Sequence, residues 1–525
     1  MIYWKLFIER IKFSFLRDYY YLFIFYFSKI SNNLIKKRFL WNIKFKKVEK
    51  KEPKGKTLLF FPSMSMGKSS FLDIGIRSFI ESSKKENIEI DLLQCFGGLD
   101  LCHLGGSPFS AKTAMPCKSC KLINSEIYSD LNIIKFPEIQ INRKDSLDSL
   151  TLNELMSFKY KNIEIGNLLT STIIWIRRTS IIDDSFKPYF IKGIDSSMKL
   201  INFLESFDLE SYDSVLVFNG LSYPESILYK ICKNKKIKVA TFEGGLDESS
   251  AYSIEYNYGY TPQHFFNFRD IRKNNSGEKR TKKNFPTAKL DNLNLYKNIE
   301  DKKIISIFGN VSWDTSQFIS NDLYKNMFQW LESLIPIIHK HKEYYFIFRP
   351  HPGESRKVKN TWYGLENWYS EYLEKTPNTL CIGRDEVFDS YDLIYRSSLV
   401  LVYNSTIGIE AVSRGRKTLT AAKSHYSNIG FIKNLKNTES YLLEIEKILM
   451  QKDFSVNKED IQLANKYLHA LRNNVSYNLD NFVQSDKNQK ISVKNIELLG
   501  EDLEIRNLVN SLQKEVSLER FFNKP

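Results

Sequence analysis

The sequence predicts an α/β protein with two Rossmann-like parallel-sheet domains, and three observations support this. Short apolar runs rich in β-branched and aromatic residues alternate with helical patterns along most of the chain. At 525 residues the chain is too long for one ordinary core. A Lys- and Asn-rich stretch at 272–289, without apolar periodicity, separates two such series and is typical of a linker.

The first series begins with a strand at 57–61, a Ser/Gly turn around Gly67 and a helix over 69–82. A strand at 88–95 follows, and then a strand–helix–strand unit at 214–218, 224–234 and 237–242. The second series has a strand at 304–308, a helix over 321–340, strands at 345–348 and 399–403, a helix over 407–414 and a strand at 417–420. The expected parts are a basic aromatic amphipathic arm (1–54), an acceptor domain (55–271), a linker (272–300), a nucleotide-sugar-binding domain (301–450) and a helical C-terminal segment (451–525).

Charge is concentrated at the N-terminus. The whole chain carries 76 basic and 61 acidic residues, a balance of +15, and residues 1–56 hold 15 Lys and Arg against 4 Asp and Glu, a balance of +11. The rest is only mildly basic, which disfavours nucleic acid as a partner. With 42% hydrophobic residues the composition is that of a globular protein.

The N-terminal arm combines this charge with aromatic residues. Its apolar run, Tyr19 to Phe27, is about half of the roughly 20 residues that a membrane-spanning helix needs. We therefore expect an arm that lies on an anionic membrane surface, with the aromatic side chains at the acyl boundary. The alternative is a helix packed on the protein's own surface with solvated lysines.

The chain has six cysteines and no secretion signal, which indicates a reducing, cytoplasmic compartment, with the protein peripheral on the inner face of the membrane. Four residues have spacing compatible with a structural zinc site: Cys102, His103, Cys117 and Cys120. The alternative is that reduced cysteines pack a loop.

Ligands of parallel α/β sheets bind beyond the carboxyl ends of the strands, so the residues that follow each strand are the candidate site. The strand at 399–403 leads into Ser405 and Thr406, which would cap a helix and present N–H groups to a phosphate, and Gly408 follows them. Glu410, one turn on, is placed to accept from ribose hydroxyls. The alternative is an ordinary helix cap with a solvent-facing Glu.

Two further loops of the second domain follow strands. Arg349 and His351 stand in the sequence Arg-Pro-His-Pro, where the prolines stiffen the loop and the two side chains could bind a diphosphate. A structural His is the alternative. Gly309 and Asn310 follow the first strand of this domain and could line the same site.

In the first domain, Asn219 and Gly220 form one turn after a strand, and Glu243 opens another. Glycine permits close approach of a ligand to the backbone, and Glu243 is placed to act as a base. Residues 66–69 resemble the end of a P-loop, but Pro62 stands where its first glycine would be, which disfavours triphosphate hydrolysis. Ser65 and Gly67 in this loop are instead expected on the acceptor side of the site.

Together these motifs resemble the bacterial capsule polysaccharide biosynthesis glycosyltransferases of the two-domain GT-B fold, which include Kdo transferases. The ordered set spans about residues 214 to 420, some 40% of the chain. The resemblance implies inverting, metal-independent transfer from a nucleotide-sugar donor to an oligosaccharide or lipid-linked acceptor, with no cofactor required for catalysis. It assigns the donor phosphate to His351, Ser405 and Thr406 and the nucleoside to Glu410; Glu243 is the candidate catalytic base.

Two alternatives remain from the sequence. A polyol-phosphate transferase of the CDP-glycerol type has similar motifs and would need a second His as base, for which His103 is the candidate. A catalytically silent, membrane-associated scaffold of the same fold is the other. Nucleotide binding separates this scaffold from both enzymes.

Overall fold

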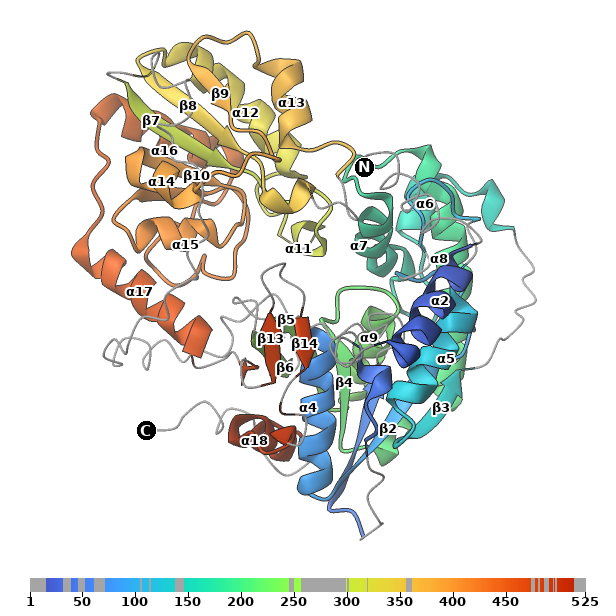
Figure 1. Cartoon of the computed structure of the whole chain (residues 1–525). Helices are drawn as coiled ribbons and strands as arrows, with labels where there is room; N and C mark the ends of the chain where they lie inside the picture. Colours follow the sequence, from blue (N-terminus) through green and yellow to red (C-terminus); the bar gives the residue numbers. More distant parts are fainter. Residues whose placement is uncertain are drawn as a thin grey trace. The chain divides into compact units, whose positions relative to one another are not determined.

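A computed structural model describes residues 16–31, 39–45, 52–60, 71–103, 106–112, 115–136, 146–244, 250–255, 299, 302–318, 320–355, 361–473, 477–479, 482–485, 491–493, 495 and 498–513. The chain forms two compact units (Figure 1). Unit 1 takes the described residues within Met1–Arg177, Asp183–Phe265 and Arg472–Pro525, and unit 2 those within Arg178–Ile182 and Phe266–Leu471. Most of the expected linker, 272–298, lies outside the described residues.

Unit 1 is built on a seven-stranded sheet in the order β12-β6-β5-β4-β1-β2-β3. Its parallel strands are β1 (Gly55–Phe60), β2 (Ile88–Cys95), β3 (Asn132–Phe136), β4 (Ser214–Phe218) and β5 (Val239–Gly244). At one edge β6 (Ser250–Glu255) and β12 (Tyr477–Asn478) run antiparallel. The expected parallel sheet is therefore present, but it is extended by two antiparallel strands.

The connections of this sheet create a switch point. From β1 the chain moves to β2 and β3 on one side, and it returns to place β4 and β5 on the other side. Beyond the carboxyl ends of β1 and β4 the connections diverge, which is where such sheets bind ligands. The helices of this unit are α2 (Arg17–Ile30), α4 (Phe71–Lys85), α5 (Cys117–Ile127), α6 (Leu152–Met156), α7 (Ile165–Arg177), α8 (Lys187–Ser206), α9 (Glu225–Lys235) and α18 (Leu503–Ser511), with short 3-10 turns at Leu40–Asn42, Leu147–Ser149, Asp184–Phe186 and Leu209–Ser211.

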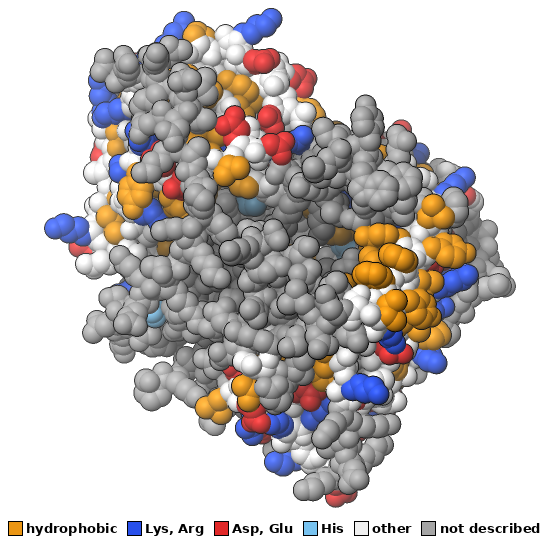
Figure 2. Space-filling model, viewed as in Figure 1, with side chains coloured by type: hydrophobic (Ala, Val, Ile, Leu, Met, Phe, Trp, Pro, Cys, Tyr) orange, Lys and Arg blue, Asp and Glu red, His pale blue; other side chains and the backbone are white. Residues whose placement is uncertain are grey.

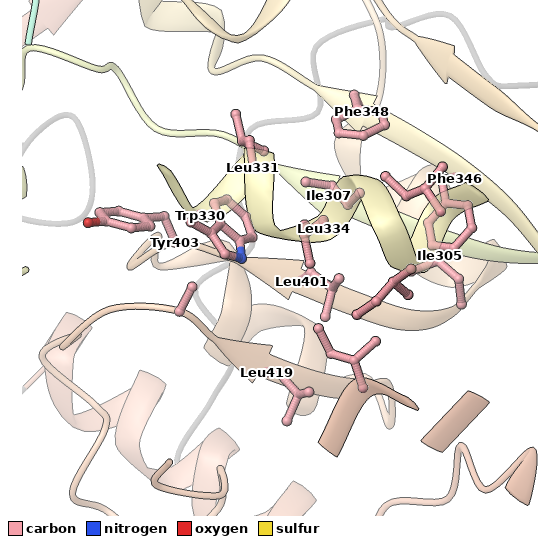
Figure 3. Close-up of a cluster of buried hydrophobic side chains, with 14 of the residues drawn as sticks. Ile305, Ile307, Trp330, Leu331, Leu334, Phe346, Phe348, Leu401, Tyr403 and Leu419 are labelled. Atoms are coloured by element: carbon pink, nitrogen blue, oxygen red, sulfur yellow. The ribbon is translucent and has the colours of Figure 1, made fainter. Parts of the chain in front are cut away.

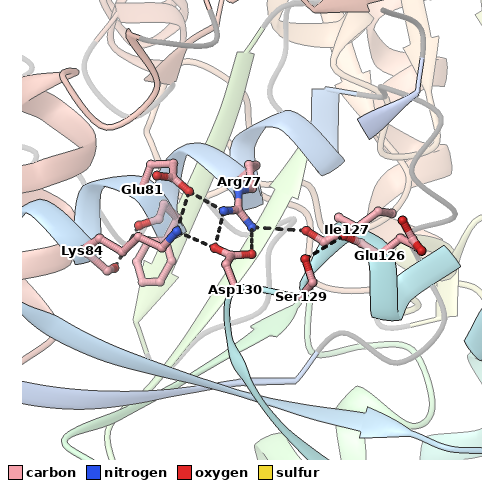
Figure 4. Close-up of polar contacts among 9 residues, drawn as sticks. Arg77, Glu81, Lys84, Glu126, Ile127, Ser129 and Asp130 are labelled. Atoms are coloured by element: carbon pink, nitrogen blue, oxygen red, sulfur yellow. Dashed lines mark hydrogen bonds and ion pairs between the residues drawn. The ribbon is translucent and has the colours of Figure 1, made fainter. Parts of the chain in front are cut away.

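A buried ion-pair network joins α4 to the turn after α5 (Figure 4). Arg77, whose side chain is fully buried, donates from Nη1 to Asp130 at 2.9 Å and also contacts Glu81. Lys84 donates to Glu81 at 3.0 Å and also pairs with Asp130. Each charge has opposite-charge partners, which buried ions need, so the network fixes α4 against the end of α5.

Unit 1 is completed by residues from near the end of the sequence. Ile505, Val509 and Leu512 are buried in the same apolar cluster as Leu59 and Ile90. β12 pairs with β6, and α18 packs on α4. The sequence predicts a helical segment over 451–525; besides α17 (Lys458–Asn473) and α18 it contains β12, β13 (Val483–Ser485) and β14 (Ile491–Val493).

Unit 2 is built on a five-stranded parallel sheet in the order β11-β10-β7-β8-β9. The strands are β7 (Lys303–Phe308), β8 (Tyr344–Arg349), β9 (Thr379–Cys381), β10 (Ser397–Val402) and β11 (Lys417–Thr420). From β7 the chain adds β8 and β9 on one side and β10 and β11 on the other, which gives this unit its own switch point between β7 and β10. The helices are α11 (Thr315–Phe318), α12 (Met327–Lys340), α13 (Leu365–Tyr372), α14 (Ser390–Arg396), α15 (Ile407–Val412), α16 (Thr438–Gln451) and α17 (Lys458–Asn473), with a 3-10 turn at Pro352–Ser355.

Helix α12 packs one apolar face on this sheet. Trp330, Leu331 and Leu334 lie against side chains from β7, β8, β10 and β11 in one buried cluster (Figure 3). The helix starts at Met327 and not near 321, because Asn326 accepts from Gln329 N–H and caps it.

All the strands expected from the sequence are present within one or two residues, because each is a run of β-rich apolar residues buried in the sheet.

Among the residues that the structure describes, no helix combines the length and apolar character that crossing a bilayer requires.

Candidate active site at the ends of the parallel strands

Four strands of unit 2 end at the same level. Phe308, the last residue of β7, is in register with Arg349 of β8 and with Val402 of β10, and Val402 is in turn paired with Thr420 of β11. The segments that follow these strands therefore emerge at one edge. They contain most of the unit-2 residues that the sequence selected.

The segment after β7 joins the segment after β10. Gln317 donates from Nε2 to Asn404 Oδ1 at 2.9 Å, and Asn404 donates from Nδ2 to Ser320 Oγ at 2.9 Å. Asn310 Oδ1 and Gln317 Oε1 are buried and have no hydrogen-bond partner within the described part of the chain. Buried amide oxygens normally accept a hydrogen bond, so these two mark a place where a donor group of a ligand would be stabilised.

Gly309 has a packing role at this edge. A Cβ at Gly309 would lie 2.6 Å from Leu365 Cδ1, and the Gly309 N–H donates to the carbonyl of Arg349 at 3.0 Å. The close approach of α13 therefore requires a residue without a side chain here.

His351 follows β8 and has a defined orientation. Its Nδ1 accepts from Gly353 N–H at 2.9 Å, so the neutral ring carries its proton on Nε2. Glu354 is fully buried in the same turn, and burial raises its pKa to about 7. The loop thus holds an imidazole donor and a carboxyl that changes charge near neutral pH.

Ser405, Thr406 and Gly408 lie at the start of α15. Tyr426 donates its hydroxyl to the carbonyl of Ser405 at 2.5 Å, and a Cβ at Gly408 would lie 2.3 Å from that Tyr426 oxygen. The glycine is therefore required for this contact. The expected helix cap is weak: Ser405 Oγ is 3.4 Å from Ile407 N, and α15 has only six residues.

The Thr406 hydroxyl is directed to an imidazole. Thr406 Oγ1 is 3.4 Å from His425 Nε2, and burial lowers the pKa of His425 to about 4, so the ring is neutral at pH 7. Tyr467 donates its hydroxyl to the carbonyl of His425 at 2.7 Å, and its oxygen lies 3.1 Å from Nδ1, which leaves Nδ1 as the donor and Nε2 as the acceptor. Thr406 therefore directs its proton to Nε2, and Ser405 is the better phosphate donor of the two.

Glu410 is buried at 5% exposure and accepts from Tyr391 O–H at 3.0 Å. A solvent-facing Glu is thereby excluded. The Tyr391 hydroxyl therefore holds this carboxylate in one orientation.

Arg349 has a structural role in unit 2. Its guanidinium is buried and donates to the carbonyls of Gly383 at 2.6 Å, Glu386 at 3.2 Å and Ile382 at 3.4 Å. These contacts hold the loop after β9 against β8. Both Nη atoms thus contact backbone, whereas the buried Nε has no hydrogen-bond partner in the described part of the chain, and phosphate binding by Arg349 stays a prediction.

The corresponding edge of unit 1 contains Asn219, Gly220 and Glu243. Asn219 Oδ1 accepts from Leu221 N–H at 2.9 Å, so its side chain builds the turn, and Gly220 has φ +75°, which favours glycine. Both therefore shape the backbone. Asn219 N–H donates to the carbonyl of Phe242, which places Glu243, partly exposed, beside this turn. Ser65 and Gly67 lie outside the described residues.

Unit 1 also contains a buried acid, Glu225, which belongs to the motif after the Asn219–Gly220 turn on which the family resemblance rests but had no predicted role. Glu225, the first residue of α9, is fully buried, and neither carboxyl oxygen has a side-chain or backbone partner beyond its own residue among the described atoms. Burial raises its pKa to about 8. Burial is a tertiary property, so no local pattern could have predicted the raised pKa of Glu225 or of Glu354.

The zinc hypothesis has no support from the geometry. Cys102, His103, Cys117 and Cys120 are all described, yet no group of three or more His, Cys, Asp and Glu among the described residues is arranged to hold a metal ion. The His103 ring packs against Trp175 with its centroid at 4.6 Å, and its Nε2 is 3.4 Å from Thr172 Oγ1. All six cysteines are free thiols. His103 is therefore directed to α7, which disfavours it as a base for polyol-phosphate transfer.

The chain thus contains two Rossmann-like units, each with a switch point at the carboxyl ends of its strands, and this confirms the predicted α/β fold class with two parallel-sheet domains. No protein-family model and no curated protein matches the sequence.

Similar solved structures include the β-Kdo 2,7 transferase KpsC of Thermosulfurimonas dismutans (14% identity, 59% of this chain and 89% of that chain, TM-score 0.29). A glycosyltransferase from Rickettsia africae is 12% identical over 87% of this chain and 99% of that chain, with a TM-score of 0.30. The UDP-GlcNAc 2-epimerase of Neisseria meningitidis is 13% identical over 80% of this chain and 100% of that chain, with a TM-score of 0.23.

Proposed function

We propose that the protein is a glycosyltransferase that moves a sugar from a nucleotide-sugar donor, bound by unit 2, to a saccharide acceptor of a surface or capsular polysaccharide. The observation that carries the proposal is the switch point of unit 2. There, the four flush strand ends bring together an oriented His351, Ser405 and two buried amide oxygens without partners in the described chain.

Each part of the donor has a chemically suitable group. The Nε2–H of His351 and the hydroxyl of Ser405 are donors for phosphate oxygens. The amide oxygens of Asn310 and Gln317 accept, as sugar or base N–H and O–H groups require. Glu410, positioned by Tyr391, would accept from the ribose hydroxyls.

In the reaction, a unit-1 carboxylate, for which Glu243 is the candidate, takes the proton of the acceptor hydroxyl. The acceptor oxygen forms a bond to the anomeric carbon of the donor, while the bond from that carbon to the phosphate oxygen breaks. The released electron pair remains on the nucleotide phosphate, where the Nε2–H of His351 stabilises the developing charge. Attack on the face opposite the leaving group gives inversion, as the family resemblance implies.

The two alternative functions, polyol-phosphate transfer and a catalytically silent scaffold, require different residues and ligands. Polyol-phosphate transfer needs a second His as base, and the buried packing of His103 disfavours it. A silent scaffold needs no nucleotide. The resemblance favours a CMP-Kdo-like donor, with UDP- and GDP-sugars as the other classes to test.

The test is a thermal-shift screen of the full chain with CMP, CDP, UDP, GDP and ATP. A ligand that binds only the folded protein raises the melting temperature. We expect one pyrimidine or guanine nucleotide to do so, and the shift to be lost in His351→Ala but kept in His339→Ala, an exposed His of the same unit. The matching nucleotide sugar is then incubated with saccharide acceptors, and the products are identified by NMR.

Transfer to the acceptor supports the proposal. Epimerised donor without transfer would replace it with a sugar epimerase, and no shift with any nucleotide would favour the scaffold.

A further inference from the structure

Helix α2 is fixed to unit 1 by one of its faces. Trp41 Nε1–H donates to Ser28 Oγ of α2 at 2.8 Å, and two further residues of this helix, Arg17 and Phe25, are buried. Asp18 accepts from the N–H of Ser119 at 2.9 Å and from its hydroxyl at 2.7 Å, at the first turn of α5. The helix is therefore a structural part of this unit, with a defined inner and outer face.

The outer face of α2 is apolar, aromatic and exposed along its whole length. Its large side chains are 40–84% exposed and recur at helical spacing: Leu16, Tyr19, Phe23, Tyr26, Phe27 and Ile30. Figure 2 shows a group of apolar side chains over α2. Single exposed apolar residues are ordinary, but a contiguous stripe of six on one helix marks an interaction surface.

Three features of this stripe fit a lipid bilayer. Four of its six residues are Tyr or Phe, and Tyr is suited to the membrane interface because its ring is apolar while its hydroxyl stays in water. Residues 1–56 have a net charge of +11, and two exposed lysines lie at α2: Lys29, which pairs with Glu126 at 3.2 Å, and Lys118, beside Asp18. A helix of 14 residues is about 21 Å long, which suits a helix lying in the interface and is too short to span it.

The positive charge of the N-terminal arm favours an anionic bilayer over a second copy of the chain as the partner of this face. A second copy of the chain would bring another arm with the same positive balance, which disfavours pairing of these faces. An anionic bilayer supplies both the apolar layer and the opposite charge.

We propose that the outer face of α2 inserts at the boundary of headgroups and acyl chains of an anionic bilayer and holds unit 1 on its surface. This inference is independent of the proposed transfer reaction, because it uses neither strand-end site.

The experiment is cosedimentation of the full chain with phosphatidylcholine vesicles, with and without phosphatidylglycerol. The test variant is Phe23→Ser/Tyr26→Ser/Ile30→Ser. The matched control is Val387→Ser/Leu443→Ser/Met450→Ser, which removes three exposed apolar side chains of unit 2. All six residues are exposed, so both variants should keep the melting temperature of the wild type.

We expect the wild type and the control to bind vesicles containing phosphatidylglycerol, and the α2 variant to bind at least about tenfold more weakly. Binding should also weaken in about 0.5 M salt, because the charges are screened. Equal binding by the α2 variant and the control would overturn the inference. So would a dimer of the wild type that becomes a monomer in the α2 variant, measured by sedimentation velocity, since a second copy would then occupy the face. Nucleotide-induced thermal shifts of the α2 variant report separately on the strand-end site.

Discussion

The Nδ1 atom of His351 accepts a hydrogen bond of 2.9 Å from the backbone N–H of Gly353. This contact decides which ring nitrogen carries the proton, and it makes Nε2 a donor at neutral pH. The two residues also touch so closely that a Cβ at Gly353 would lie 2.8 Å from Nδ1.

Replacement of Gly353 by Ala should therefore weaken nucleotide binding although the imidazole is still present. The added methyl group displaces the ring, and we expect a Kd about tenfold higher, the loss of roughly one charge-assisted hydrogen bond, by isothermal titration calorimetry. Gly383→Ala is the control, because a Cβ there meets only the flexible ends of Glu366 and Glu386. Equal Kd values for both variants would show that the tautomer contact does not matter for binding.

Nucleotide binding should depend on the charge of Glu354. Its pKa is raised by burial to about 7, so the carboxyl is neutral at pH 6 and ionised at pH 8, where it repels an anionic phosphate. We expect wild-type affinity to fall between these pH values by more than in Glu354→Gln. Phosphate ionisation is the same for both proteins, so the difference between the two pH profiles isolates this carboxyl. Parallel profiles would contradict the prediction.

Glu225 should destabilise unit 1 at alkaline pH. The folded-state pKa is about 8 because the carboxyl is buried, against 4.5 for the unperturbed group, so the unfolded chain loses its proton first as pH rises. Stability should decline from about pH 4.5 to pH 8, by roughly 3 to 5 kcal/mol in total at about 1.4 kcal/mol per pKa unit.

Glu225→Gln removes this titration. Urea unfolding should give it a larger free energy of unfolding than the wild type at pH 8 and little difference at pH 4.5. Glu210→Gln, at a side chain that is 72% exposed, is the control and should show no such trend. A Glu225→Gln protein that gains nothing at pH 8 would argue against a neutral buried acid.

Gly408→Ala should disrupt the start of α15. A Cβ there would lie 2.3 Å from the Tyr426 hydroxyl, which donates to the Ser405 carbonyl. We expect a loss of about 1 to 3 kcal/mol of stability and weaker nucleotide binding, since overpacking forces neighbouring groups to move. Adding Tyr426→Phe removes the clashing oxygen and should recover part of the stability. If the double variant is less stable than either single variant, this clash is not the cause.

The strands were predictable because each is a short run of β-rich apolar residues, and parallel topology then places the residues that follow them at one edge. His351, Ser405 and Glu410 were selected in this way, and their binding of the donor stays a prediction. The backbone contacts of Arg349 could not be predicted, because its carbonyl partners, Ile382 to Glu386, lie more than 30 residues further along the chain. A local sequence pattern cannot predict contacts between residues this far apart in the chain.

The same limit explains the other differences. His103 has ligand-like spacing to Cys117, but its ring packs on α7, about 70 residues away in sequence. Burial raises the pKa values of Glu225 and Glu354, and the sequence does not show which acids are buried. For α2, the aromatic run predicted an amphipathic arm, whereas the Ser28–Trp41 and Asp18–Ser119 contacts show which of its faces is covered.

Unit 1 is discontinuous, and this has a consequence for its synthesis. Ile505, Val509 and Leu512 complete a core whose first strands lie more than 400 residues earlier, whereas unit 2 is nearly contiguous. On a ribosome, the residues of unit 2 emerge while the apolar cluster of unit 1 still lacks α18. Nascent unit 1 thus exposes part of its core until translation has passed the end of unit 2, and apolar surface exposed in this way is prone to aggregation.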